Sequence, residues 1–532
     1  MFPSRAGKVL LVAAVAGVAV AAPLSTVTLD YGTFTGLTDA TNEIVYFRGV
    51  KFADAPVGAL RWQAPVSPPT MHLGNVNATQ YAAECIATTQ TTTSSTTAED
   101  CLFINVFIPI ATTATSALPV LVYFHGGGFE GGTAAGAPPE NIIQNSAKPL
   151  IFATVQYRLG QFGFLGGTPV ANNGALNAGL LDQKAALVWI QRYISKFGGD
   201  PRRVTIWGES AGAGSTMFHL VGNDGANGNL FHQAMGDSPS LSFLPHYTDS
   251  FVEDLFTQFA GFAGCGSSGT GDAIMACLRA APVNTIASAG SKILGNRTSS
   301  LYPLAPIADG KFIATRPVEA FKSGLFARVP VLFGSNTNEG AHWSAGLANP
   351  AANTSEANAT ETTVYNFITG QFSTFTRASF DKAIAELYPL ADYNNSFSLQ
   401  GQQMYGEMRY ICSAVLIAGA AHDFGLPAYQ YHWDNPTLSS DHGADLNAFF
   451  DGTRTFDADD QAIVNAMRGY FTSFVTDGTP VAANAITWPS AVDSNGSPRI
   501  FLHPGDLSLE NVTEALSERC AFWHGLSGEI ST

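Results

Sequence analysis

The stretch best suited to do chemistry is "WGESAGAGS" at residues 207–215, where Gly208 and Gly212 frame Ser210. A strand pattern, "RVTIW", precedes this serine, and a helical pattern, "AGAGSTMFHL", begins directly after it at Ala211. A sharp turn from strand to helix presents a serine hydroxyl at the edge of a sheet, and the glycines leave room where side chains would collide. The turn also places the hydroxyl at the positive end of the new helix. The pattern predicts that Ser210 is a nucleophile; the alternative is a plain serine in a glycine-rich turn.

A serine hydroxyl becomes a nucleophile only when a histidine takes its proton and a carboxylate holds that histidine. In the order Ser, acid, His, Glu339 follows the buried strand pattern at 329–334, and His442 lies in the polar loop after the strand pattern at 427–433. These are the predicted acid and base. Asp309 is the rival acid, although it lies in a short turn. His503, in "FLHPGD", is the best alternative base, whereas His422 in a helical pattern and His432 in a strand pattern are expected to be core or surface residues.

Acyl transfer also needs donors for a developing oxyanion, and "YFHGGGFEGG" at 123–132 can supply them. Three consecutive glycines after a strand let backbone N–H groups approach a ligand closely. A tight turn or a phosphate-binding loop would look similar. The phosphate alternative lacks the lysine of G-x-x-x-x-G-K-[ST].

Short apolar segments alternate with helical patterns along the chain. Between the second and third segments, Leu180, Leu187, Ile190 and Ile194 fall on one helical face, which Gly198-Gly199 closes. Strands that are apolar on both faces are typical of a mostly parallel sheet covered by helices on both sides. We therefore predict one α/β domain with a large wound sheet and insertions. The expected strands are 118–124, 150–156, 203–207, 329–334 and 427–433.

The composition favours a single well-buried domain. Hydrophobic residues make up 46% of the 532 residues and charged residues 13%, unlike a disordered chain. Lys and Arg total 26 against 42 Asp and Glu, for a formal net charge of −16. An acidic surface does not attract nucleic acid or anionic membranes. Two low-complexity stretches, 88–97 and 347–363, interrupt the alternation of strand and helix patterns, and the second is expected to be a surface excursion.

The N-terminus has the pattern of a secretory signal peptide at residues 1–21. A basic start with Arg5 and Lys8 precedes the apolar run from Val9 to Val20, and small residues follow at the cleavage positions. The alternative, a membrane anchor, is disfavoured because about a dozen apolar residues fall short of the roughly 20 that span a bilayer. We expect a secreted protein with no stable membrane insertion.

Cysteines and glycosylation sequons agree with export. Six cysteines form an even set that suits three disulfides, and no clustered Cys/His spacing indicates a metal site. They are Cys85, Cys101, Cys265, Cys277, Cys412 and Cys520. The predicted N-glycosylation sites are Asn77, Asn296, Asn353, Asn358, Asn394, Asn495 and Asn511.

With these motifs in place, the chain resembles the type-B carboxylesterase/lipase family, which includes cholinesterases and secreted fungal esterases. "FGGDPRRVTIWGESAG" (197–212) is similar to the family's serine signature, and "EDCLFINVFIP" (99–109) to its second signature. The resemblance implies an α/β-hydrolase fold over residues 22–532. It also implies a triad of Ser210, Glu339 and His442, with the backbone N–H groups of Gly127, Gly128 and Ala211 as oxyanion donors.

The resemblance further implies a set of structural bonds. The disulfides would be Cys85–Cys101 and Cys265–Cys277, with Cys412 and Cys520 placed like a third pair of the cholinesterase branch. The structural ion pairs would be Arg48–Glu99 and Arg158–Asp182.

The loop between the first two cysteines, residues 86–100, informs the substrate. Lipases of the family carry a long amphipathic lid there, whereas this loop is short and rich in Thr and Ser, so it offers little apolar surface to bind an interface. We expect a secreted, cofactor-independent carboxylic-ester hydrolase that acts on moderately apolar or aryl small-molecule esters. The alternatives are a lipase or sterol-ester hydrolase, a feruloyl-type esterase and, remotely, a non-catalytic cholinesterase-like binding protein. The sequence leaves the oligomeric state open.

Overall fold

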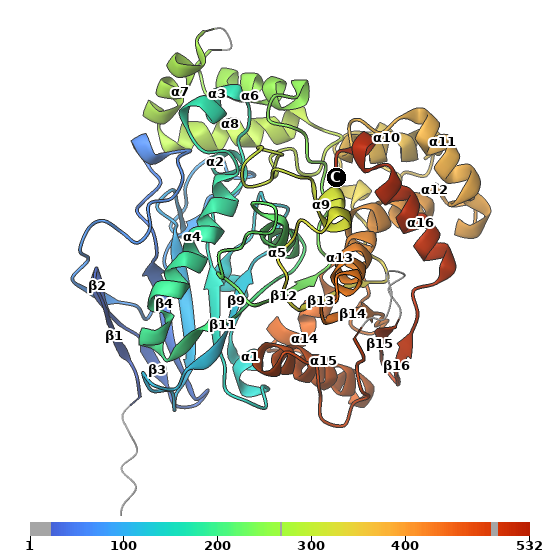
Figure 1. The fold of residues 1–532 in the computed structure, drawn as a ribbon. Coiled ribbons are helices and arrows are strands. Elements are labelled where there is room, and N and C mark those ends of the chain that lie inside the picture. The colour runs from blue at the N-terminus through green and yellow to red at the C-terminus, as the bar shows by residue number, and fades with distance from the viewer. Residues whose placement is uncertain (1–22, 267–268, 491–497) are drawn as a thin grey trace, which may run out of the picture.

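The computed structural model describes residues 23–266, 269–490 and 498–532. The predicted signal peptide and the sequon at Asn495 therefore lie outside the described residues. The described chain forms an 11-stranded sheet together with two small sheets. Figure 1 shows helices packed on both faces of the large sheet.

Seven neighbouring strands at the centre of the large sheet run parallel, and its edges are antiparallel. All five predicted strands belong to the parallel part, which confirms the expected fold class. In sheet order the strands are β16 (Asp506–Glu510), β15 (Arg499–His503), β14 (Ala428–Trp433), β13 (Val331–Asn336), β12 (Gln233–Asp237), β11 (Gly199–Gly208), β9 (Leu118–Phe124), β10 (Ile151–Val155), β8 (Phe103–Pro109), β4 (Ile44–Lys51) and β3 (Leu37–Asp39).

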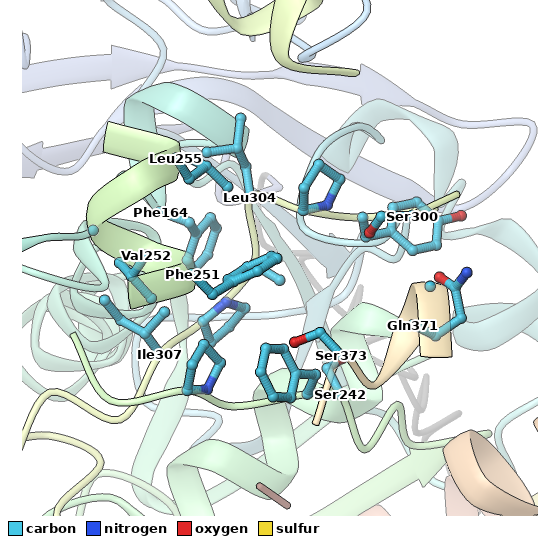
Figure 2. A pocket seen from close by; sticks show the side chains of 18 of the residues that line it. Phe164, Ser242, Phe251, Val252, Leu255, Ser300, Leu304, Ile307, Gln371 and Ser373 are labelled. Carbon is cyan, nitrogen blue, oxygen red and sulfur yellow. The ribbon is translucent and has the colours of Figure 1, made fainter. Parts of the chain in front are cut away.

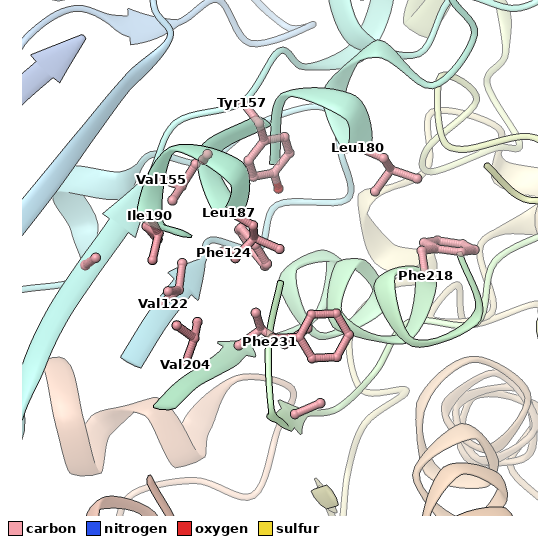
Figure 3. Close-up of a cluster of buried hydrophobic side chains, with 14 of the residues drawn as sticks. Val122, Phe124, Val155, Tyr157, Leu180, Leu187, Ile190, Val204, Phe218 and Phe231 are labelled. Carbon is pink, nitrogen blue, oxygen red and sulfur yellow. The ribbon is translucent and has the colours of Figure 1, made fainter. Parts of the chain in front are cut away.

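Each face of the sheet has its own hydrophobic core, because successive strand residues point to opposite sides. On β9, Val122 and Phe124 belong to one core and Leu121 and Tyr123 to the other. The first core, part of which Figure 3 shows, packs against α4 (Ala178–Tyr193), α5 (Ala211–Val221), α9 (Pro317–Ser323) and α13 (Cys412–Asp423). The second packs against α1 (Glu140–Gln144), α14 (Asn447–Phe450) and α15 (Ala458–Asp477).

The predicted helix before β11 is α4, and its apolar face is buried as expected. Leu180, Leu187 and Ile190 have no exposed surface. The α-helix ends at Tyr193, and the chain tightens into a 3₁₀ turn that Gly198 closes at a φ of 85°. A tighter last turn is a common way to end a helix before a glycine in the left-handed region.

Two outer helical layers carry the insertions, each around its own core. One contains α6 (Ser250–Phe262), α7 (Gly271–Ala280) and α8 (Val283–Asn296); the other contains α10 (Glu361–Gln371), α11 (Arg377–Glu386), α12 (Phe397–Gly406) and α16 (Glu514–Gly525). The stretch 347–363 was expected to be a surface excursion, and this expectation is wrong for part of it. Leu347 and Ala352 are buried in the second layer, and the stretch runs into the first turn of α10.

All six cysteines are paired in the structure: Cys85–Cys101, Cys265–Cys277 and Cys412–Cys520. The expected ion pair of Arg158 with Asp182 is present and buried, with Nη2 2.7 Å from Oδ1.

The other expected ion pair, Arg48–Glu99, is wrong. Glu99 binds Arg61, whose Nη2 donates to Oε2 at 2.8 Å and whose Nη1 donates to the carbonyl of Leu278 at 2.8 Å. Arg48 instead stacks on tyrosines, with its guanidinium carbon 4.3 Å from the ring centre of Tyr46. Glu99 pairs with Arg61 rather than with Arg48 because the Arg61 guanidinium can donate hydrogen bonds to the carboxylate and, at the same time, to backbone carbonyls at the C-terminal end of α7.

The described sequon asparagines differ in exposure. Asn353 is 9% exposed, and its side-chain oxygen accepts hydrogen bonds from the backbone and hydroxyl of Ser355. The others are exposed: Asn77, Asn296, Asn358, Asn394 and Asn511.

Candidate active site

Ser210 lies between the end of β11 and the start of α5, in a backbone conformation with φ 56° and ψ −119°. This conformation is strained for a residue with a side chain. The flanking glycines are required by packing: a Cβ on Gly208 would stand 2.3 Å from the carbonyl carbon of Gly212, and one on Gly212 would stand 1.9 Å from the oxygen of Phe124. The predicted sharp turn is therefore present.

His442 and Glu339, predicted from separate loops, meet in the structure. Nδ1 of His442 lies 2.5 Å from Oε2 of Glu339. The other oxygen of Glu339 accepts hydrogen bonds from the Ser238 hydroxyl at 2.5 Å and from the backbone N–H of Asn336 at 2.6 Å. The carboxylate is thus fully held in place, and it fixes the imidazole with Nε2 directed away from it.

The rival residues have other partners. Asp309 accepts hydrogen bonds from the Asn177 side chain at 3.0 Å and from the backbone of Ile313 at 2.8 Å. His432 binds Glu510 at 2.8 Å, and the ring of His503 lies 3.8 Å from Asp434. His422 is at the end of α13.

Nε2 of His442 faces the serine turn. It lies 3.2 Å from Oε1 of Glu209, the residue before Ser210, and within the described part of the chain this buried nitrogen has no aligned hydrogen-bond partner. Burial alone would lower the pKa of His442, but the carboxylates of Glu209 and Glu339 outweigh it and raise that pKa. Burial raises the pKa of Glu209 to about 7, so this carboxyl titrates near neutral pH.

Sequence reasoning missed Glu209 and a further acidic residue, Asp445. The Asp445 carboxyl accepts a hydrogen bond from the Tyr431 hydroxyl at 2.6 Å and lies 3.3 Å from the side-chain nitrogen of Asn336. Burial raises its pKa to about 6. Glu209 could have been predicted from the sequence, because it is an ionisable residue inside the serine motif. Asp445 could not, because only the folded structure brings it close to the site.

The glycine loop lies against the serine turn. A Cβ on Gly126 would stand 3.1 Å from Cβ of Ser210 and 2.9 Å from the carbonyl oxygen of Glu209. Gly127 and Gly128 have φ values of 106° and 64°, which glycine adopts without strain. The N–H at the start of α5, that of Ala211, belongs to the adjoining turn. The three expected donors therefore belong to two segments in contact.

Aromatic rings enclose the imidazole. The ring centre of Tyr410 lies 4.1 Å from that of His442, and the ring centre of Trp343 lies 5.3 Å from it. The Trp343 indole donates a hydrogen bond to the backbone oxygen of Glu339 at 2.8 Å. This wall excludes water from one side of the His442–Glu339 pair, which strengthens their interaction.

A pocket adjoins the glycine loop (Figure 2). Tyr302 connects the two, because a Cβ on Gly128 would stand 2.1 Å from its ring carbons while Tyr302 also lines the pocket. In Figure 2 apolar side chains occupy one side and polar ones the other. The apolar group includes Phe164, Phe251, Val252, Leu255, Leu304 and Ile307; the polar group includes Ser300, Gln371 and Ser373.

The described residues contain no group of three or more His, Cys, Asp or Glu side chains arranged to hold a metal ion. None of the helices in this part of the chain is both long and apolar enough to cross a membrane.

Comparisons with known proteins identify the family and the fold. A sequence model described as "Carboxylesterase family" matches residues 23–523. The chain is 31% identical to "Secreted lipase 1" of Botryotinia fuckeliana (strain B05.10), over 91% of this chain and 89% of that protein. It is 30% identical to "Lipase 1" of Geotrichum candidum, over 86% of this chain and 88% of that protein. The crystal structure of Aspergillus niger EstA matches with a TM-score of 0.84 and 28% identity, covering 96% of this chain and 99% of that chain.

Proposed function

The chain belongs to the carboxylesterase family, and on that premise we propose that it is a secreted serine esterase that cleaves small-molecule carboxylic esters through an acyl-enzyme. The observation that carries the proposal is the fixed pair of Glu339 and His442, whose free nitrogen faces the turn that holds Ser210. A serine is activated when an imidazole can take the proton of its hydroxyl and a buried carboxylate holds that imidazole in place.

In the proposed first step, Nε2 of His442 takes the proton of the Ser210 hydroxyl while the oxygen attacks the ester carbonyl. The tetrahedral intermediate collapses when His442 returns the proton to the leaving alcohol. His442 then takes a proton from water, whose oxygen attacks the acyl-serine, and the acid leaves as Ser210 regains its proton. Glu339 stabilises the imidazolium and keeps Nδ1 protonated.

The backbone N–H groups of Gly127, Gly128 and Ala211 are the proposed oxyanion donors. Support comes from the contact between the glycine loop and the serine turn and from the positive φ of both glycines. Donors of this kind each contribute about 100- to 1,000-fold to turnover.

The short first loop favours an esterase for moderately apolar or aryl esters. In the described structure residues 89–96 are a hydrogen-bonded Thr/Ser segment, anchored by a bond from the backbone of Thr93 to Asn284 at 3.0 Å. Such a segment offers no apolar face to a lipid surface. A lipase is the second candidate, because two relatives are named lipases. The proposal also includes sterol and feruloyl-type esters as alternative substrates, and hydrolysis rates on a panel of such esters distinguish them.

The proposal includes export. Residues 1–21 are the proposed signal peptide and residues 22–532 the mature enzyme domain, with glycans on exposed sequons. Three disulfides agree with an oxidising compartment.

The test is Ser210→Ala, compared with Ser195→Ala at an exposed serine of the 3₁₀ turn after α4. We expect Ser210→Ala to lower hydrolysis of 4-nitrophenyl butyrate by roughly 10⁴-fold or more, with unchanged circular dichroism and thermal unfolding. A fluorophosphonate probe should label the wild type and the control but not the variant. Near-normal turnover in a folded Ser210→Ala protein overturns the proposal, and an unlabelled, inactive wild type favours the non-catalytic binding protein.

A further inference from the structure

Arg409 differs from the other buried arginines of the described chain. It is 3% exposed, yet within the described residues it forms no ion pair, and its Nε is buried without a hydrogen-bond partner. The other four each donate to a carboxylate or to a backbone carbonyl: Arg61 to Glu99, Arg158 to Asp182, Arg499 to Glu510 and Arg468 to the oxygen of Ala448.

Aromatic rings hold the Arg409 guanidinium in place. Its central carbon lies 5.3 Å from the ring centre of Tyr302, 5.9 Å from that of Tyr405 and 5.7 Å from that of Tyr410. The ring faces attract a cation, and the Tyr410 hydroxyl also stabilises the Arg409 charge. The buried Nε still lacks an acceptor, and burying a charged donor without one is costly, so the site has capacity for a partner that the described residues do not supply.

Local backbone geometry directs the residue inward. Arg409 lies in the π-helical turn Glu407–Ile411, between α12 and α13. A π-helical turn inserts an extra residue into a helix and is frequent at functional sites. This turn therefore carries the buried arginine whose Nε lacks an acceptor within the described residues.

Arg409 lines the pocket beside the glycine loop, and so does a second unsatisfied polar group. Ser242 is 4% exposed, its hydroxyl has no partner within the described residues, and it lies at the edge of the pocket in Figure 2. The remaining walls are mainly phenylalanine, leucine, isoleucine and proline. A ligand end that satisfies Arg409 and Ser242 is rich in oxygen and negatively charged, and the carbon atoms next to it would contact the apolar side of the pocket.

The pocket adjoins the proposed reaction centre through two tyrosines. The Tyr410 ring contacts both Arg409 and His442, and the Tyr302 ring lies against Gly128. Glu130 is an acidic side chain close enough to feel the Arg409 charge. It accepts a hydrogen bond from the backbone of Leu304 at 2.7 Å and forms no ion pair in the described structure. Burial raises the pKa of Glu130 to about 8, so near neutral pH this group is largely uncharged and leaves the Arg409 charge unbalanced.

We propose that this pocket binds the carboxylate end of an ester's acyl or alcohol arm, with Arg409 as the specificity-determining residue. The preferred substrates are then monoesters of dicarboxylic acids, or esters of hydroxy acids, rather than uncharged esters of the same length. The inference rests on the proposed function for its statement that the ligand is an ester substrate. An arginine fork pairs with a carboxylate through two parallel hydrogen bonds, which gives both affinity and orientation.

The test measures binding to Ser210→Ala protein by calorimetry, so that no turnover is needed. Two matched pairs place the charge on either arm: monomethyl against dimethyl suberate, and 6-acetoxyhexanoate against its methyl ester. For at least one pair we expect the anionic member to bind about tenfold or more tightly, as for a charge-assisted hydrogen-bonded pair. Adding Arg409→Met should abolish this preference, and adding Arg409→Lys should retain part of it.

Arg328→Met is the matched control, because Arg328 also stacks on aromatic rings, those of Phe326 and Phe424, but is exposed. It should leave the preference intact. If Ser210→Ala protein binds both members of each pair equally, the inference is overturned, even if an arginine variant fails to fold. A preference for the anionic member that survives Arg409→Met also overturns it. If the wild type hydrolyses 4-nitrophenyl butyrate but shows no preference, the inference alone fails; if binding discriminates but no ester is cleaved, the proposed function alone fails.

Discussion

Replacing Gly128 with alanine should displace a proposed oxyanion donor without removing any reacting side chain. The new Cβ would stand 2.1 Å from two carbons of the Tyr302 ring. Carbon atoms in contact stand roughly 3.5 Å apart, so either the ring or the loop must retreat by about 1.4 Å. The φ of 64° adds about 1–2 kcal/mol of backbone strain for a residue with a side chain.

A displacement of about 1 Å can cost roughly 100-fold in rate, and the loss of one donor costs about 100- to 1,000-fold, or about 2.7–4 kcal/mol. We therefore expect kcat/KM of Gly128→Ala for 4-nitrophenyl butyrate to fall at least about 100-fold, with most of the loss in kcat. Steady-state kinetics together with thermal unfolding measure both consequences.

Gly131→Ala is the control in the same loop, since a Cβ there meets only the oxygen of Gly127, at 3.8 Å, in ordinary contact. Its kcat/KM should stay within a few-fold of the wild type. The reasoning is refuted if Gly128→Ala retains wild-type turnover, or if both variants lose activity equally.

Three further predictions follow from features outside the glycine loop. Because the Glu209 carboxylate favours the protonated form of His442, Glu209→Gln should lower the pKa of His442 and move the acid limb of the kcat/KM–pH profile to lower pH; a limb that stays or moves upward contradicts this. The disulfide of Cys412 and Cys520 spans 108 residues, so replacing both by serine should destabilise the protein by about 4–5 kcal/mol and lower its unfolding temperature, and an unchanged thermal scan would count against it. Mass spectrometry after enzymatic glycan release in H₂¹⁸O should find Asn353 unmodified, because its side chain is buried, and a glycan there would contradict the described packing.

The sequence predicted those features that depend on neighbours along the chain. The serine turn follows from a strand, two glycines and a helix within about a dozen residues, and the parallel strands follow from short apolar runs. Glu339 and His442 were selected because each follows such a strand, and the structure brings them into contact. Their catalytic roles stay a prediction until the variants are measured.

The features that the sequence did not predict depend on contacts between distant segments. Arg48 and Arg61 are equally plausible partners for Glu99 in sequence, and only the position of the α7 end favours Arg61. The burial of Leu347 depends in the same way on helices that begin after it. Arg409 looks like an ordinary helical arginine until the pocket around it is known.

The position of the proposed triad relative to the outer helices has a consequence for redesign. Ser210, Glu339 and His442 each follow the carboxyl end of a sheet strand, whereas much of the pocket wall comes from α6 and from residues 300–307. The proposed triad and the apolar side of the pocket therefore come from separate segments of the chain. Chimeras that exchange residues 245–310 with those of a relative should change the apolar side of the pocket while retaining Arg409 and the proposed triad.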